Sequence, residues 1–337
     1  MSERVPLSVL DLAPVPAGVE PGEALRNSID LARHAERRGY HRHWVAEHHN
    51  VPGIASSSPA VLIAHLAMAT STIRVGSGGV MLPNHASLTV AEQFGMLEAL
   101  HPGRIDLGLG RAPGTDQVTA AALRRGPTQA EDGFPTQLRE LLSYFDGTHP
   151  QITAVPAEGH RPALWMLGSS DYSATVAGHL GVPFSFAHHF ASTNTASALA
   201  VYRESFRPSA WLEQPYAMIG VPVVCADTTE HAEYLAMPSA LSFTRLRMGR
   251  PIQLATPEEL VDHEWSPMEE TLLRSWRGPQ VIGDPGSVRD QLDELVDRFR
   301  VQELMITTMT HGHVDRLHSY DLVADAWQPA DALADAG

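Results

Sequence analysis

Short apolar segments alternate with amphipathic segments along most of the chain, and this alternation constrains the fold more than any other feature. The segments predicted as strands are Val5–Leu12, His43–Ala46, Ile73–Gly76, Arg104–Leu109, Ala163–Leu167, Val182–Ala187, Tyr216–Ala226 and Glu303–Thr308. The segments predicted as helices are Gly22–Arg38, Pro59–Thr70, Leu88–Leu100, Tyr172–Leu180, Thr195–Phe206, Glu230–Ala240 and Asp315–Ala326. Eight strands with intervening helices predict an α/β fold of the (β/α)8 TIM barrel type, which 337 residues suit.

One late stretch breaks this rhythm. Residues from about Thr244 to Pro285 contain five prolines and scattered charge. We interpret residues 244–285 as an insertion over the barrel mouth. No linker marks a second domain, so residues 1–337 are predicted to form a single domain.

A doubly wound sheet is the rival fold, and one glycine cluster could support it. Gly108, Gly110 and Gly114 follow a predicted strand, but their spacing is G-x-G-x-x-x-G. A dinucleotide-binding fingerprint needs G-x-G-x-x-G and an acidic residue about 20 positions later. The cluster therefore favours a turn after a barrel strand.

The composition excludes several classes of function. The 24 basic residues are all arginine and face 39 acidic residues, a net charge of −15, which argues against nucleic acid and anionic membranes as partners. Without lysine, Schiff-base chemistry and a Walker-type phosphate loop are excluded, so arginine, hydroxyls or backbone amides must hold any phosphate. The single cysteine, Cys225, predicts a buried thiol and a cytoplasmic protein, and we expect neither a signal peptide nor a membrane span.

Residues suited to chemistry follow the predicted strands repeatedly. They are Glu47, His48 and His49, then Gly78 and Gly79, Gly110 and Arg111, Ser169 and Ser170, His188 and His189, and His311 and His313. Because barrel enzymes place their catalytic groups at the carboxyl ends of strands, we expect these residues to gather at one end.

Two chemistries fit such a histidine-rich barrel mouth. The first is a metal-dependent hydrolase, but the first strand ends in Val9-Leu10-Asp11-Leu12, without a His-x-His pair. The second is a flavin site, in which Ser169, Ser170 and Ser173 at a helix start and Arg111 would bind a phosphate. The residues alone leave both open.

Five segments together resemble the bacterial-luciferase-like flavin-dependent monooxygenases of the single-chain type. They are Val45–His49, Ile73–Pro83, Gly103–Gly114, Gly168–Ser173 with Gly181–Pro183, and Ile282–Pro285. Their order spans nearly the whole chain, and they are also similar to members that tailor polyketide antibiotics. The resemblance implies a barrel that binds reduced FMN from a separate flavin reductase and oxygenates a small organic substrate with dioxygen through a flavin hydroperoxide.

The resemblance also assigns roles to residues. It implies that His48 is catalytic. We expect His48, paired with Glu47 or His49, to manage a proton, because an ordinary pKa of about 6.5 lets a histidine give or take a proton near neutrality. The cofactor-binding residues are predicted as Gly78, Gly79, Gly110, Arg111, Gly168, Ser169, Ser170 and Ser173, with a cis peptide at Gly78–Gly79. The substrate pocket is predicted to include His49, His188 and His189, and no metal is expected.

The family pattern further implies a homodimer through the second and third helices, where Ala60, Ala64, Ala67 and Ala69 would allow close packing. Gly110, Ser169 and His188 replace a cysteine, a glutamate and a tryptophan of light-emitting relatives, so light emission and aldehyde oxidation are not expected. Three alternatives stay open: a deazaflavin-dependent hydride-transfer oxidoreductase, a non-catalytic flavin-binding protein, and the metal-dependent hydrolase.

Overall fold

The computed structural model describes residues 4–112, 114–123 and 133–327. Its strands are β1 Leu7–Asp11, β2 Arg42–Val45, β3 Arg74–Met81, β4 Ile105–Gly110, β5 Ala163–Gly168, β6 Phe184–Phe186, β7 Ala217–Cys225, β8 Val281–Gly283 and β9 Glu303–Thr307. Its α-helices are α1 Pro21–Arg37, α2 Pro59–Ala69, α3 Ser87–Leu100, α4 Gln117–Leu123, α5 Phe134–Phe145, α6 Asp171–Leu180, α7 His188–Ala191, α8 Thr195–Ser205, α9 Thr229–Arg247, α10 Pro267–Arg277, α11 Pro285–Phe299 and α12 His313–Trp327.

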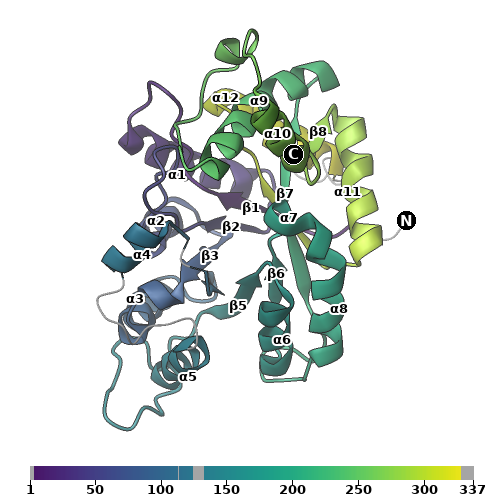
Figure 1. Ribbon diagram of the computed structural model, residues 1–337. Helices are drawn as coiled ribbons and strands as arrows, with labels where there is room; N and C mark the ends of the chain where they lie inside the picture. Colours follow the sequence, from purple (N-terminus) through teal and green to yellow (C-terminus); the bar gives the residue numbers. More distant parts are fainter. Residues whose placement is uncertain (1–3, 113, 124–132, 328–337) are drawn as a thin grey trace.

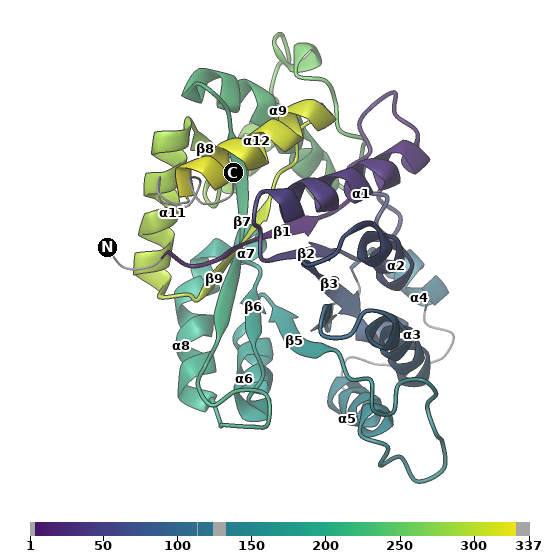
Figure 2. The same cartoon turned by 180° about the vertical axis from the view of Figure 1, so that it is seen from behind.

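Parallel strands close into a barrel with helices around it (Figures 1 and 2). Neighbours pair in chain order from β1 to β7, and closure comes from β7 pairing with β9 and β9 pairing with β1. The predicted TIM barrel is confirmed, with β9 as the predicted eighth strand. The doubly wound alternative is wrong, because Gly108 and Gly110 lie within barrel strand β4.

The segment 244–285 was predicted to break the pattern of strands and helices because of its five prolines, but it contains helices and a strand. Helix α9 continues past the predicted end at Ala240 to Arg247, although Pro238 lies inside it, because buried Leu235, Leu241 and Thr244 anchor the helix around the proline. The segment also contains α10 and the short strand β8, which pairs only with β7 among the described strands.

Main-chain hydrogen bonds tie this segment to the first loop of the barrel. The amide of Ala17 donates to the Leu254 carbonyl at 2.8 Å, and the amide of Leu254 donates to the Val15 carbonyl at 3.2 Å. The amide of Val15 also donates to Gly53, in the loop after β2, at 2.9 Å. Segments far apart in the sequence therefore meet above the strands.

The barrel interior has two levels. Near the amino ends of the strands, Arg42 donates to Asp106 and to Glu303 at 2.7 Å each, and both carboxylates are fully buried. Above this ion network, Trp44 and Trp165 meet edge to face at 5.0 Å, and the Trp44 indole donates to Asp106 at 2.8 Å. The lower interior is packed, and the barrel opens toward the carboxyl ends of the strands.

The outer helices cover the strands with apolar side chains. Helix α5 was not predicted, although Phe134, Leu138, Leu141 and Phe145 recur at helical spacing and are all buried. Cys225 is buried and unpaired, as predicted. Within the described ranges, every helix is too short or too polar to cross a membrane.

Candidate functional site

A pocket opens at the carboxyl ends of the barrel strands. Its empty volume, counted with the open mouth, is about 1020 Å³. The predicted site residues that line the pocket are His48, Gly78, Gly110, Arg111, Gly168, Ser169, Ser170, Ser173 and His189. These residues come from the ends of five strands, β2 to β6, and are brought together as the pattern of strand ends predicted.

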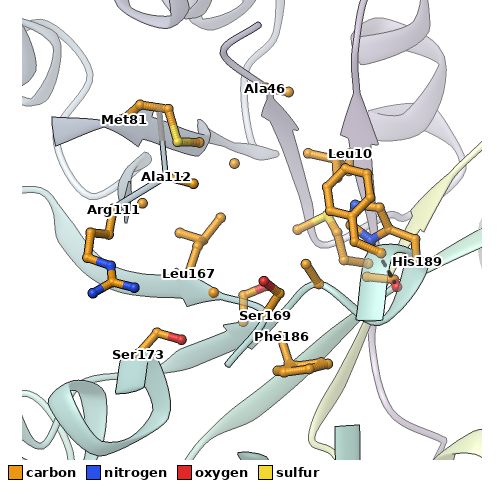
Figure 3. Close-up of a pocket in the computed structure, with 18 of the residues that line it drawn as sticks. Leu10, Ala46, Met81, Arg111, Ala112, Leu167, Ser169, Ser173, Phe186 and His189 are labelled. Atoms are coloured by element: carbon orange, nitrogen blue, oxygen red, sulfur yellow. Dashed lines mark hydrogen bonds between the residues drawn. The ribbon is translucent and has the colours of Figure 1, made fainter. Parts of the chain in front are cut away.

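One end of the pocket is suited to an anion. Figure 3 shows Arg111 and Ser173 at this end, away from His189. The Arg111 guanidinium lies 4.3 Å from the centre of the Tyr172 ring and forms no ion pair with any described residue. No side chain caps the start of α6 at Ser170, so the first amides of this helix remain available to a ligand.

The remaining polar groups at this end fit the same purpose. The Ser173 hydroxyl donates to the Ser170 carbonyl at 2.8 Å, so its single O–H would have to rotate away from that carbonyl to donate to a phosphate. The Asp171 carboxylate accepts a hydrogen bond from Ser197 on α8 at 3.3 Å and keeps its negative charge. The positive charge available to a phosphate at this end therefore comes from Arg111 and the amino end of α6.

Two glycines keep backbone close to the pocket. The Gly78–Gly79 peptide is cis, as the resemblance implied. A Cβ atom on Gly78 would lie 2.7 Å from Leu10 Cδ1 and 3.2 Å from Trp44, and one on Gly168 would lie 1.8 Å from Ser173 Oγ. Any larger residue at either position would collide with its neighbours, so the flat cradle depends on glycine.

His48 lies in the pocket wall, whereas Glu47 lies behind it. Burial lowers the pKa of His48, and a main-chain hydrogen bond with Gly114 opposes that shift. The imidazole is therefore neutral at pH 7 and can accept a proton from a bound molecule.

Glu47 is fully buried and does not line the pocket. Its carboxylate accepts hydrogen bonds from His49 and His85 at 3.0 Å, from Asn84 at 3.1 Å and from the Met81 amide at 2.9 Å. Burial raises the pKa of Glu47, but the hydrogen bonds from these donors together lower it by more, so the pKa lies below its ordinary value. The carboxylate joins the loop after β2 to the end of β3.

His188 and His189 face different surroundings. His188 Nδ1 lies 2.7 Å from the Thr195 hydroxyl, and its ring contacts Phe299 outside the barrel. Burial and the nearby charge of Arg298 lower the pKa of His188 to about 4. His189 lines the pocket, and its Nδ1 lies 3.2 Å from the Gly220 carbonyl.

Four predicted site residues do not line the pocket: Glu47, His49, Gly79 and His188. His49 and Glu47 bond to one another behind the wall, Gly79 packs against the Gly108 carbonyl, and His188 packs against outer helices. The sequence places each residue after a strand, but it does not show which of two neighbours turns inward. Of the two other predicted histidines, His311 contacts the Ala17 carbonyl at 3.4 Å and His313 pairs with Asp30 at 3.0 Å.

Two residues that contact the predicted site residues were not predicted. Tyr172 stacks with Arg111, and His85 bonds to Glu47. Tyr172 directly precedes the predicted Ser173, so its position was the available signal. Phe190, next to the predicted His189, lines the pocket and contacts the His189 ring at 4.1 Å between centroids. His85 follows Pro83 and Asn84 beyond the predicted third strand and carried no such signal.

A second cavity adjoins the pocket. Its empty volume with the open mouth is about 1300 Å³, and both spaces share Leu12, His189 and Phe190 in their walls. Residues of α9 and the segment around Trp276 form much of its far wall. Across the described residues, no group of three or more histidine, cysteine or acidic side chains could hold a metal ion.

Comparison with known proteins gives concordant results. Residues 5–302 match the model of a family described as luciferase-like monooxygenase. A protein of that same name from Escherichia coli (strain K12) is 47% identical over 325 residues, covering 96% of this chain and 97% of the relative. The crystal structure of apo-MsnO8 superposes with a TM-score of 0.89 at 39% identity, covering 96% of this chain and 98% of that one.

More distant structures share the fold alone. The oxygenating constituent of 3,6-diketocamphane monooxygenase from Pseudomonas putida, solved with FMN, is 18% identical with a TM-score of 0.70, covering 96% of this chain and 97% of that one. An F420-dependent secondary alcohol dehydrogenase is 12% identical with a TM-score of 0.72, covering 97% of this chain and 100% of that one.

Proposed function

The chain belongs to the luciferase-like monooxygenase family, and we propose that it is the FMN-dependent oxygenating component of a two-component system. A separate flavin reductase would supply reduced FMN, and a small organic substrate such as a polyketide or other secondary metabolite would be oxygenated. When bound, reduced FMN supplies the electrons that activate dioxygen.

The observation that carries the proposal is that the pocket has an anion-binding end and an apolar middle. At one end, Arg111, the free amides of α6 and three serine hydroxyls surround a space suited to one phosphate. Between the ends, Gly78 and Leu167 offer a flat, apolar surface to a ring system. The buried neutral His48 is available to manage a proton, and the apolar wall excludes water.

Cofactor binding tests this proposal directly. Wild-type protein should bind FMN more tightly than riboflavin, since only FMN presents a phosphate. Arg111→Ala should lose about tenfold or more in FMN affinity and much less in riboflavin affinity. Equal losses for both ligands would place Arg111 elsewhere, and preferential binding of the deazaflavin F420 would favour the hydride-transfer alternative.

Turnover tests the oxygenation. With a flavin reductase, NADH and a substrate panel, ¹⁸O₂ should add one labelled oxygen atom to the product. His48→Ala should abolish product while leaving FMN affinity unchanged, and unchanged turnover would remove His48 from the reaction. Oxygen consumption without a labelled product across the panel would favour a flavin-binding role.

We also propose a homodimer through α2 and α3. Val61 and Met68 on α2 are 61% and 77% exposed, and Met96 and Leu100 on α3 are 52% and 68% exposed. Ala67 instead packs into the barrel's own core. Met68→Glu should convert a dimer into a monomer in light-scattering chromatography, whereas a monomeric wild type would contradict the proposal.

The remaining expectations are proposals of the same kind. We propose that residues 1–337 act as one domain, with 244–285 over the barrel mouth; the hydrogen bonds between Leu254 and the first loop support this. A cytoplasmic location is supported by the buried, unpaired Cys225. Limited proteolysis would test the single domain, and fractionation of the native cells would test the cytoplasmic location.

A further inference from the structure

His189 and Phe190 stand where the two cavities meet. Both residues line both spaces, and Figure 3 shows His189 beside Leu10 at the end of the pocket away from Arg111. The second cavity is mostly apolar, with Phe243, Trp276 and Met309 in its wall, and Arg247 is the one charged side chain among its described lining residues. A molecule lying in both spaces would therefore be elongated, mostly apolar and not cationic.

The structure defines which nitrogen of His189 carries its proton. Nδ1 lies 3.2 Å from the Gly220 carbonyl oxygen, which can only accept a hydrogen bond, so Nδ1 must donate. The contact depends on Gly220, because a Cβ atom there would lie 2.7 Å from Nδ1. With Nδ1 protonated in a neutral ring, Nε2 presents a lone pair.

The surroundings keep that ring neutral and leave Nε2 available. Burial lowers the pKa of His189 to about 4, and the neighbouring titratable groups His188 and His48 shift it in the same direction. Among the described residues, the hydrogen bond of the His189 ring is the one from Nδ1 to Gly220, and Nε2 is left for a molecule in the pocket. His188, the adjacent residue, differs because it bonds to Thr195 behind the wall.

We propose that His189 determines specificity: its Nε2 accepts a hydrogen bond from a hydroxyl or N–H group of an elongated apolar substrate at the junction of the two cavities. This assignment rests on the proposed function, because it concerns the substrate of that same site. A substrate lacking a donor would leave a lone pair desolvated without a partner, and the site would reject it.

The test compares two probes that differ in one donor. 4-Octylphenol can donate a hydrogen bond, whereas 4-octylanisole, its methyl ether, can only accept one. Quenching of tryptophan fluorescence measures their binding in the absence of flavin, because Trp276 lies in the cavity wall. The measurement therefore stays informative even if oxygenation is never detected.

The wild-type protein should bind the phenol about tenfold more tightly than the ether. His189→Phe should abolish this preference while keeping an apolar ring, and His189→Gln, which retains an acceptor, should keep part of it. Gly220→Ala should weaken the preference by displacing the ring. His179→Phe, an exposed substitution on α6, is the matched control and should behave as wild type.

Circular dichroism and the midpoint of urea unfolding serve as folding controls for every variant. An unchanged preference in folded His189→Phe would overturn the proposal, and so would a wild-type protein that binds neither probe or prefers the ether. By contrast, a failure to bind FMN with the preference intact would count against the proposed function and leave the role of His189 standing.

Discussion

Replacement of Glu47 by glutamine should destabilise the protein measurably, although it removes no volume. The Glu47 carboxylate accepts hydrogen bonds on both oxygens: His49, Asn84 and His85 contact Oε1, while Met81 N–H and His85 contact Oε2. A glutamine has one accepting oxygen, so in either orientation its NH₂ group faces a donor. At least one hydrogen bond to a charged group is lost, a change of about 1.5–3 kcal/mol.

The pH dependence gives a second, independent check. The folded-state pKa of Glu47 lies below its ordinary value of about 4.3. Its contribution is therefore fully present above that ordinary value and is lost as the pH falls through the folded pKa. The difference in unfolding free energy between wild type and variant should be constant from pH 7 to about pH 5 and narrow below it.

Urea unfolding followed by circular dichroism measures both effects. Glu204→Gln is the matched control, because Glu204 is exposed on α8 and should change stability by less than about 0.5 kcal/mol. The reasoning would be refuted if Glu47→Gln were as stable as wild type at pH 7. A difference that grew on acidification would refute the assigned direction of the pKa shift.

Three further predictions concern packing and capping. Arg42→Met should lower the unfolding free energy by about 3–5 kcal/mol, since Asp106 and Glu303 would be left buried without their partner, and urea midpoints should show it. Gly78→Ala should cost about 1–3 kcal/mol through collision with Leu10 and weaken FMN binding in titrations; a neutral result in both would contradict the close approach. Ser266→Ala removes a capping box at α10 and should cost about 1 kcal/mol in thermal unfolding, without altering FMN affinity.

The barrel could be predicted because each strand carries its own local signal. Runs of valine, isoleucine and leucine predicted the strands, and the predicted strand ends were less accurate where such runs stopped. The third strand was predicted to end at Gly76, but β3 continues to Met81. The added residues include Gly78 and Gly79, which have no side chain and therefore give no hydrophobic strand pattern. Gly76 is required by the packing, because a Cβ atom there would lie 2.5 Å from the Asp106 side chain.

The site could be predicted only to the level of the strand ends. His188 and His189 are the same residue type at adjacent positions in the sequence. The short helix α7 nevertheless turns the His188 side chain away from the pocket and the His189 side chain into it. Likewise, Glu47 was predicted to be catalytic because it precedes His48 in the sequence. The structure shows that its hydrogen-bond partners Asn84 and His85 come from another loop and hold it behind the pocket wall. Such orientations depend on long-range contacts that a local pattern does not contain.

The pairing of β1 with β9 has a consequence for biosynthesis. Leu7 lies opposite Leu304, so one edge of the first strand cannot be covered until β9, far along the sequence, has left the ribosome. Until then the nascent sheet exposes two unpaired edges, which are sites for association with other chains. The high sequence separation also slows folding, so chaperone demand during translation should be set by this last seam of the barrel.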